Sequence, residues 1–365
     1  MHRDLLHLIL YSDGFGVTKK KSISGLYLTF GNMSLKASSM LENIFVLGFL
    51  ANRSTWSDAF HLFEKELLEL QSGVTFTRYD GKKVLLKAFI AYHKNDMSEF
   101  AKIGRQVGPS GDKFCRHCYI SKADGFSTGL SSDSESWRSL QDQNIVSDLF
   151  KRLKKTGDAY KLRKAFGYCN RRNVFRRIYF DPIEMALLDP YHSLLFGQVK
   201  KVHMTVYSIL SENGRMTMEL RYENMPLPGS IPKLRSTNPD CWESRSMTEY
   251  LYFLTPMPYL YHGLIPHSIV AALMVWRDGI RNIFKESSVL EKPSFYVEYA
   301  TEIARNLLIF HNWAAALGKS QLKVPTFHSI LHLIHYSKRI GNIRLYGTQR
   351  EESKNSAVKA LFFSA

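Results

Sequence analysis

The chain is poor in cysteine, in long apolar runs and in acidic residues. Four cysteines among 365 residues are too few for a disulfide scaffold, so a reducing compartment, cytosol or nucleus, is expected. No apolar stretch approaches the roughly 18 to 20 residues that span a bilayer, and the first residues lack a signal-peptide pattern. No internal repeat stands out. These absences argue against a disulfide-rich secreted protein, a membrane-spanning protein and a repeat array.

Positive charge dominates what is present. Lysine and arginine total 49 against 33 aspartates and glutamates, a formal net charge of +16. A field of that sign attracts polyanions, so nucleic acid is the leading partner and a membrane surface the alternative. Basic residues are densest from residue 151 to 177, where several phosphates could be neutralised unless this is only a solvated helix face. With 45% apolar residues, the chain should fold around a sizeable core.

Apolar periodicity over the first hundred residues predicts the order strand, strand, strand, helix, strand, helix. The expected segments are 4–13, 24–32, 43–51, 54–73, 84–96 and 97–108. The first and fourth strands each run into a carboxylate, Asp13 and Asp96. This is the element order of the ribonuclease H-like fold, in which those two strands are neighbours. Because parallel neighbours end at the same edge of a sheet, we expect Asp13 and Asp96 to face each other.

The character of the chain changes beyond residue 120. Residues 121–137 are rich in Ser, Gly and Asp, which is typical of a loop or linker, and residues 140–320 are mostly helical in period. The sequence therefore predicts an α/β fold whose mixed sheet is interrupted by a large, mostly α-helical insertion. The expected division is 1–120 for the first part of the core, 121–320 for the insertion and 321–365 for the C-terminal part of the core.

A C-x-x-C motif, Cys115 to Cys118, is half of a tetrahedral zinc site, although two structural thiols at a helix start would give the same pattern. A complete site needs two more ligands. The segment "FHSILHLIHY" offers His328, His332 and His335, whose spacings of four and three put them on one helix face. Taken alone, that helix is more simply an ordinary half-buried one.

Two further groups of polar residues stand out. Asp189 and His192 lie three residues apart around a proline, which alone indicates only a turn and a packed histidine. Glu351 and Glu352 are adjacent acids before a helical pattern. Paired acids on a helix are usually solvated, so they matter only if that helix packs beside the sheet edge that carries Asp13 and Asp96.

Four blocks in this order resemble the CACTA or En/Spm transposases of the CMC superfamily, whose DDE catalytic domain is an interrupted ribonuclease H-like fold. The blocks are "LYSDGFGV", "YHKNDMSEF" with "CRHC" after it, "DPYHSLLFG", and "FHSILHLIHY" followed by "REESKNSAVK". The interval from Asp96 to Cys115 is similar to that in the related recombinase of antigen-receptor gene rearrangement. The resemblance covers nearly the whole chain.

The resemblance implies a DNA transposase that cleaves DNA phosphodiesters at transposon ends and transfers the 3′-hydroxyl strand. It implies that Asp13, Asp96 and Glu352 bind Mg²⁺ or Mn²⁺ in a two-metal site, with Glu352 favoured over Glu351 by its spacing to the asparagine and lysine that follow. It further implies a structural zinc on Cys115, Cys118, His328 and His332, and a place near the active site for Asp189 and His192. A nuclear location and a homo-oligomer on DNA are expected.

Two alternatives stay open at this stage. One is a domesticated or decayed DNA-binding protein that keeps the fold and the basic surface without catalysis. The other is a generic ribonuclease H-like nuclease without strand transfer. The sequence starts just ahead of the first catalytic strand and displays no end-recognition module upstream, which fits a fragment, a domesticated copy or a decayed one.

Overall fold

The computed structural model describes residues 5–18, 21–34, 37, 40–50, 56–95, 101–123, 137–153, 155–169, 178, 180–226, 236–242, 246–285, 293–319, 325–341, 347–348 and 353–354. The chain forms two compact units. The first comprises Met1–Ala123, Asp133–Asp189 and Tyr346–Ala365, and the second comprises Asp124–Ser132 and Pro190–Leu345.

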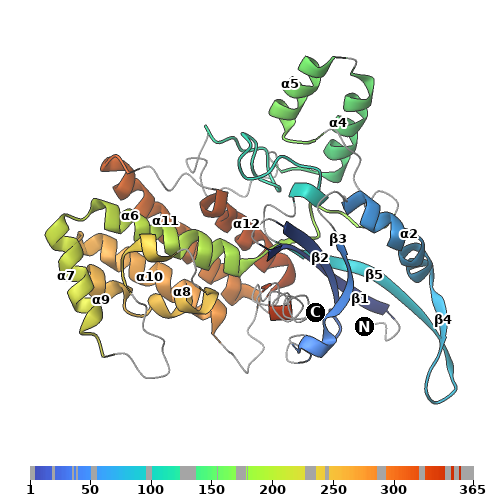
Figure 1. Ribbon diagram of the computed structural model, residues 1–365, viewed down its shortest axis with the longest axis horizontal. Coiled ribbons are helices and arrows are strands. Elements are labelled where there is room, and N and C mark those ends of the chain that lie inside the picture. The colour runs from blue at the N-terminus through green and yellow to red at the C-terminus, as the bar shows by residue number, and fades with distance from the viewer. Residues whose placement is uncertain are drawn as a thin grey trace. The chain divides into compact units, whose positions relative to one another are not determined.

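An antiparallel meander opens the first unit, as the sequence predicts. It consists of β1 (Leu5–Thr18), β2 (Lys21–Phe30) and β3 (Phe45–Leu50) (Figure 1). The expectation that the first strand ends at Asp13 is wrong. Asp13 pairs with Gly25 and the ladder continues to Thr18, because the partner strand β2 supplies hydrogen-bonding groups along this whole length.

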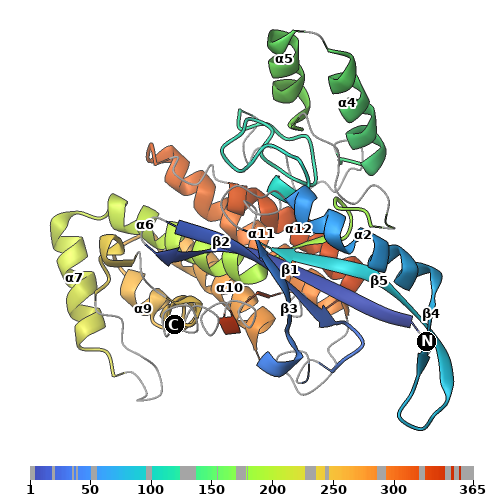
Figure 2. The ribbon, with the colours of Figure 1, turned by 45° about the vertical axis from the view of Figure 1, so that its right-hand side comes forward.

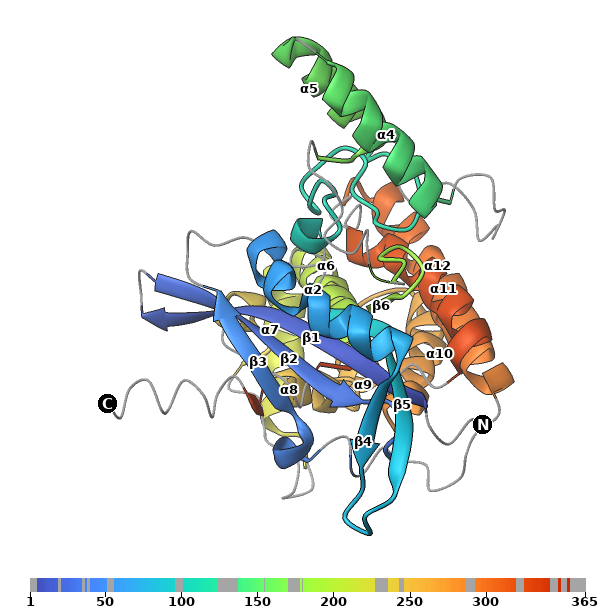
Figure 3. The same cartoon turned by 90° about the vertical axis from the view of Figure 1, so that its right-hand side faces the viewer.

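Helix α2 (Trp56–Ser72) lies along one face of this sheet (Figure 3). Trp56 and Phe60 join Leu10, Leu26 and Ile90 in a buried apolar cluster. Gly73, the last residue of the predicted segment, ends the helix: it has a φ of 111°, which favours glycine, and its N–H donates to the Glu69 carbonyl.

Strand β5 (Lys83–Asn95) runs parallel to β1 and beside it (Figure 2). Their register shifts by one residue between Leu8 and Ile9, and the last residue pair between the two strands is Tyr11 with Lys94. Asp13 therefore lies just beyond the point at which β1 leaves β5, although β1 itself continues along β2. Asp96, the second predicted aspartate, lies outside the described residues.

Two short strands complete the sheet. Strand β4 (Val74–Thr77) forms a hairpin with the start of β5, and β6 (Ala186–Leu188) runs parallel to its end. The strand order is β3-β2-β1-β5-β4, with β6 paired to β5. The sequence prediction missed both, because three or four residues give too little periodicity. The α/β class with a mixed sheet is confirmed.

Helices α4 (Leu140–Arg152) and α5 (Thr156–Phe166) also belong to the first unit. Ser139 and Asp142 form a capping box at the start of α4, which satisfies two backbone donors that the helix leaves open. Gly167 ends α5 in the left-handed conformation, with φ 72°. A Cβ there would also meet Lys113 and Arg138 at 2.7 Å, so the end of α5 is held against both residues.

The described residues of the second unit are mainly helical, as the period of the sequence predicts. They comprise a π-helix η4 (Tyr191–Val199), α6 (Lys200–Ile209), α7 (Glu212–Glu223), η5 (Pro239–Trp242), α8 (Met247–Phe253), α9 (Met257–Tyr261), α10 (His267–Phe284), α11 (Pro293–Ala316) and α12 (Pro325–Ile340). α11 packs between α10 and α12. Among the described helices, none has the length and apolar character that crossing a membrane requires.

Candidate metal centre

The two cysteines of the C-x-x-C motif lie in a buried loop of the first unit. The backbone N–H of His117 donates to Cys115 Sγ at 3.3 Å, and that of Ile120 bonds to the Cys118 thiol and lowers its pKa. Each sulfur thus accepts an N–H from two residues further on. The pKa of Cys118 is nevertheless raised, first by its hydrogen bond with Cys115 and then by burial. A cation would substitute for the proton that the two sulfurs share.

The loop is organised by a buried guanidinium, that of Arg138. Its Nε donates to the carbonyls of Cys115 at 2.9 Å and Cys118 at 3.0 Å, and its two Nη atoms donate to the carbonyls of Phe166 and Lys113. The guanidinium also lies over the rings of Tyr119 and Tyr168, with 4.5 and 4.9 Å to the ring centroids. The planar guanidinium of Arg138 therefore holds both cysteine carbonyls in place and connects them to the end of α5.

Further hydrogen bonds connect the cysteine loop to the end of β5. Arg116 Nη1 donates to Asn95 Oδ1 at 3.4 Å, and Gln106 Nε2 donates to the Arg116 carbonyl at 3.0 Å. Asn95 is the last residue of β5 and the residue before Asp96. The cysteine loop is thus connected to the strand that leads into the second predicted catalytic aspartate.

The histidine pair lies on α12 in the second unit. His328 and His332 are both buried, and their Nε2 atoms are 3.0 Å apart. Residues four apart stack on one helix face, so both rings point the same way. Two neutral imidazoles with facing Nε2 atoms either share one proton or direct two lone pairs at a common cation.

The start of α12 packs against η4, which contains the end of the predicted D-P-x-H block. A Cβ on Gly197 of η4 would lie 2.6 Å from Thr326 Cβ and 3.0 Å from the His192 carbonyl. Gln198 Nε2 also donates to the Thr326 carbonyl at 3.4 Å. The glycine therefore permits a close approach that fixes the helix two residues before His328.

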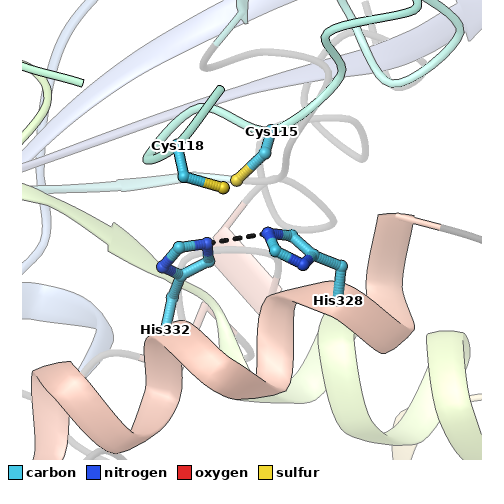
Figure 4. Close-up of side chains that lie close together, drawn as sticks. All are labelled: Cys115, Cys118, His328 and His332. Carbon is cyan, nitrogen blue, oxygen red and sulfur yellow. Dashed lines mark hydrogen bonds between the residues drawn. The ribbon is translucent and has the colours of Figure 1, made fainter. Parts of the chain in front are cut away.

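All four predicted zinc ligands form one buried group, Cys115, Cys118, His328 and His332 (Figure 4). Each offers one ligand atom, and these atoms lie within 4.8 Å of one another. Tetrahedral zinc with ordinary bond lengths needs about 3.3 Å between two nitrogens and about 3.8 Å between two sulfurs. The donor set and the 3.0 Å between the two histidine nitrogens fit such an ion. The group can hold a metal ion such as zinc, and His335 is not part of it.

Asp13 has a buried tyrosine as its neighbour in the sheet. The partner of Asp13 on β2 is Gly25, and a Cβ on that glycine would lie 2.5 Å from the Tyr27 hydroxyl. The Tyr27 ring thus covers the glycine and brings its hydroxyl beside Asp13. Burial first and then the charge of Asp13 raise the pKa of Tyr27. This phenol remains a hydrogen-bond donor throughout the physiological range.

Behind Asp13, β1 and β5 are joined by a buried side-chain contact. Ser12 Oγ and His93 Nε2 lie 3.0 Å apart, and both residues are fully buried. Burial first and then the charge of Arg116 lower the pKa of His93 to about 3. The imidazole is therefore neutral, and the pair holds the register of the two strands one residue before Asp13.

Asp189 is buried directly after β6 and accepts two hydrogen bonds from one residue. The Thr348 hydroxyl donates to Oδ2 at 2.7 Å and the Thr348 N–H to Oδ1 at 3.3 Å. His192 lies on η4, in ring contact with Phe196 at 5.6 Å. The segment around the predicted glutamates also touches η1 (Leu41–Asn43), since Lys354 Nζ donates to the Leu41 carbonyl. Glu351 and Glu352 themselves lie outside the described part of the chain.

The sequence prediction missed three residues that organise these sites: Arg138, His93 and Thr348. Arg138 follows a Ser-rich stretch, and nothing in its sequence context distinguishes it from a surface arginine. Thr348 has a weak signal, since it stands four residues before Glu352, between the two stretches of the fourth block of the resemblance.

Comparison with known proteins found no family model that matches the chain and no curated protein that matches it.

Proposed function

We propose that the chain is the catalytic domain of a CACTA-type DDE transposase, with a ribonuclease H-like sheet. One observation carries the proposal: β1 and β5 are parallel neighbours, and the last residue pair between them is Tyr11 with Lys94. Asp13 and Asp96 each stand two positions further along the sequence. Because both aspartates follow the last β1–β5 pair by the same number of residues, the register favours a shared metal site at the point where the two strands separate.

The strand order supports the same proposal. The meander β3-β2-β1 is continued by β5, the next long strand after α2, on the far side of β1. In the ribonuclease H-like fold the first and fourth strands are neighbours in this way. The +16 net charge supports DNA as the substrate.

Two hydrogen bonds support the assignment of Glu352 to the same sheet. Thr348, four residues before it, bonds to Asp189 after β6, and Lys354, two residues after it, bonds to the Leu41 carbonyl before β3. Both partners belong to the sheet-bearing unit. Chain segments on either side of Glu352 are thus attached to that unit.

In the proposed reaction, water attacks a DNA phosphorus, a P–O bond forms, and the bond to the 3′-oxygen breaks. The freed 3′-hydroxyl then loses its proton and attacks a phosphorus in target DNA. A new P–O bond forms as the bond from that phosphorus to the target strand's own 3′-oxygen breaks, and the released 3′-oxygen takes up a proton. Divalent cations held by Asp13, Asp96 and Glu352 would supply charge stabilisation at the entering and leaving oxygens. The role of the chain's own residues is positioning: the Ser12–His93 contact fixes the β1–β5 register, and the Tyr27 hydroxyl, close enough to feel the charge of Asp13, offers that carboxylate a hydrogen-bond donor.

We assign the Cys₂His₂ group to a structural zinc. A full set of four protein ligands leaves no open position for substrate or water, which argues against catalysis at this ion. The cysteine loop contacts Asn95 directly through Arg116, and Arg138 connects it to the end of α5. The ion would therefore help to hold the loop against the end of β5.

The activity test uses a labelled DNA duplex with Mn²⁺, and a pre-cut 3′-hydroxyl end with target DNA. We expect nicking by the wild-type chain, joined product from the pre-cut end, and loss of both in Asp13→Ala. Asp80→Ala is the matched control, because Asp80 is an exposed aspartate in the β4–β5 turn of the same sheet.

Three outcomes decide between the candidate functions. Nicking without joined product would favour a nuclease. DNA binding without nicking in any divalent cation would favour a non-catalytic relic. Equal nicking by Asp13→Ala and wild type would refute the active-site assignment. For the zinc, metal analysis should give one ion per chain, lost in Cys115→Ser and kept in Cys241→Ser, whose cysteine is exposed.

A further inference from the structure

A cavity of about 360 Å³ lies between α5 and the loop of residues 107–113. Its size falls at the lower end of the range of about 300–1,000 Å³ for small-ligand pockets. The helix contributes Tyr160, Arg163 and Lys164, whose spacings of three and four put them on one face. None of the predicted catalytic acids, Asp13, Asp96 and Glu352, is among its lining residues.

The lining is cationic. Lys113, Arg163 and Lys164 oppose one acid, Asp112, which leaves a net charge of three minus one, or +2. Lys113 Nζ donates to the Tyr119 carbonyl at 2.7 Å, so it stiffens the wall. Arg163 and Lys164 are exposed and form no ion pair with a described residue. These two side chains can neutralise an anion that enters the cavity.

An exposed aromatic ring stands beside these cations. Tyr160 is 68% exposed and makes no ring contact with another described aromatic residue. An aromatic side chain that served packing would be covered, whereas this ring offers a face to solvent at the mouth of a cationic cavity. Aromatic rings next to basic side chains are the combination that binds single-stranded nucleic acid, since every base can stack and every phosphate is charged.

The walls are fixed in place before any ligand arrives. The Gly111 N–H donates to the Gly108 carbonyl, and Lys122 Nζ donates to the Ser110 carbonyl at 2.6 Å. The Val107 N–H donates to the Gly167 carbonyl at 2.8 Å, which joins the loop to the end of α5. Such preorganisation lowers the entropy cost of binding.

We propose that this cavity binds one unpaired nucleotide of a DNA strand, with the base stacked on Tyr160 and the adjoining phosphate held by Arg163 and Lys164. The choice of DNA rests on the proposed function, and the cavity itself requires only a stacked base beside a phosphate. A transposase has to handle unpaired strands at a cleaved end, which gives the site a place in that reaction.

The test measures fluorescence anisotropy of a labelled single-stranded DNA of mixed sequence, with Ca²⁺ in place of Mg²⁺. Tyr160→Leu should weaken binding at least about fivefold, in line with the measured cost of losing one stacked base. Tyr160→Phe keeps the ring and should bind within about twofold of wild type. The double variant Arg163→Gln, Lys164→Gln should reduce the salt-dependence slope by about 1.4.

Lys161→Gln is the matched control, because Lys161 lies on the same helix but outside the lining and pairs with Asp158 at 3.9 Å. It should bind within about twofold of wild type. The proposal is overturned if Tyr160→Leu binds like wild type, or if Lys161→Gln loses as much as the double variant. All substitutions are at exposed positions, and unchanged thermal unfolding will establish that each variant is folded.

Three competing ligands complete the test. Tighter binding of a blunt duplex or of RNA than of the DNA strand would overturn the assignment, as would equal binding of a free nucleoside monophosphate. If no chain, wild type included, nicks DNA while single-stranded DNA binding still depends on Tyr160, only the proposed catalysis is refuted. The two proposals can therefore fail separately.

Discussion

Replacing Arg138 should damage the metal centre more than any other change of a residue that is not a ligand. The guanidinium is 2% exposed and supplies hydrogen bonds to four backbone carbonyls at three different places in the chain. Arg138→Lys keeps the charge but replaces a planar fork by a point ammonium with three donors. We expect it to reach at most two of the four carbonyls.

The cost follows from the carbonyls that lose their donor. A buried polar group left without a partner costs about 1–3 kcal/mol, so two such carbonyls cost about 2–6 kcal/mol. That is a large part of the roughly 5–15 kcal/mol by which a folded domain is stable. Two of the carbonyls belong to Cys115 and Cys118. Zinc affinity should therefore fall about 10- to 100-fold, as is typical when a residue that hydrogen-bonds to a metal-ligating residue is replaced.

The assay is competition of purified protein with a zinc chelator, together with urea unfolding of the zinc-loaded chain. Arg152→Lys is the control, since Arg152 is exposed at the end of α4 and its change should alter stability by less than about 0.5 kcal/mol. The reasoning fails if Arg138→Lys holds zinc as tightly as wild type and unfolds at the same urea concentration.

Three further changes test other contacts. Gly197→Ala should lower the free energy of unfolding by about 1–3 kcal/mol through its clash with Thr326, and it should weaken zinc binding. Its control is Gly214→Ala, which meets no atom closer than 3.4 Å and should leave thermal stability unchanged or raise it. His93, whose pKa is held near 3 against 6.5, contributes stability that is present above pH 6.5 and lost as the pH falls towards 3, by up to about 1.4 kcal/mol per pH unit. His93→Gln should flatten that part of a urea-unfolding pH profile, and an unchanged slope would contradict the assignment. Tyr27→Phe should lower Mn²⁺-dependent nicking about tenfold with an unchanged unfolding temperature, and full activity would show that its hydroxyl does not position Asp13.

Sequence patterns predicted those parts of the molecule that depend on neighbours along the chain. Alternating apolar residues indicated β2, an apolar run indicated β3, and helical spacing indicated α2. The C-x-x-C and H-x-x-x-H spacings offered candidate ligands, and the resemblance selected the four that form the metal group. Each of these patterns lies within a segment of about twenty residues. The joining of the two ligand pairs was an inference from the resemblance, and the proximity of the four ligand atoms confirms it.

Contacts between segments far apart in the chain have no comparable pattern in the amino-acid sequence. The hydrogen bond from Arg138 to Cys115 joins residues 23 positions apart in the sequence, and the one from Thr348 to Asp189 joins residues 159 positions apart. Neither residue type is unusual where it stands. The extension of β1 past Asp13 was missed for a related reason, because Asp and Gly disfavour strands locally while the pairing with β2 overrides that preference.

Arg138 joins two features that otherwise look independent, the cysteine loop and the cavity beside α5. Its Nε serves the Cys115 carbonyl, while its Nη atoms serve Phe166 at the end of α5 and Lys113 in the cavity wall. A loss of zinc that loosens the loop should therefore loosen the cavity as well. If so, removing zinc with a chelator weakens single-stranded DNA binding of wild type and has little further effect on Tyr160→Leu. Equal weakening of both would mean that the ion stabilises the fold without acting on the cavity.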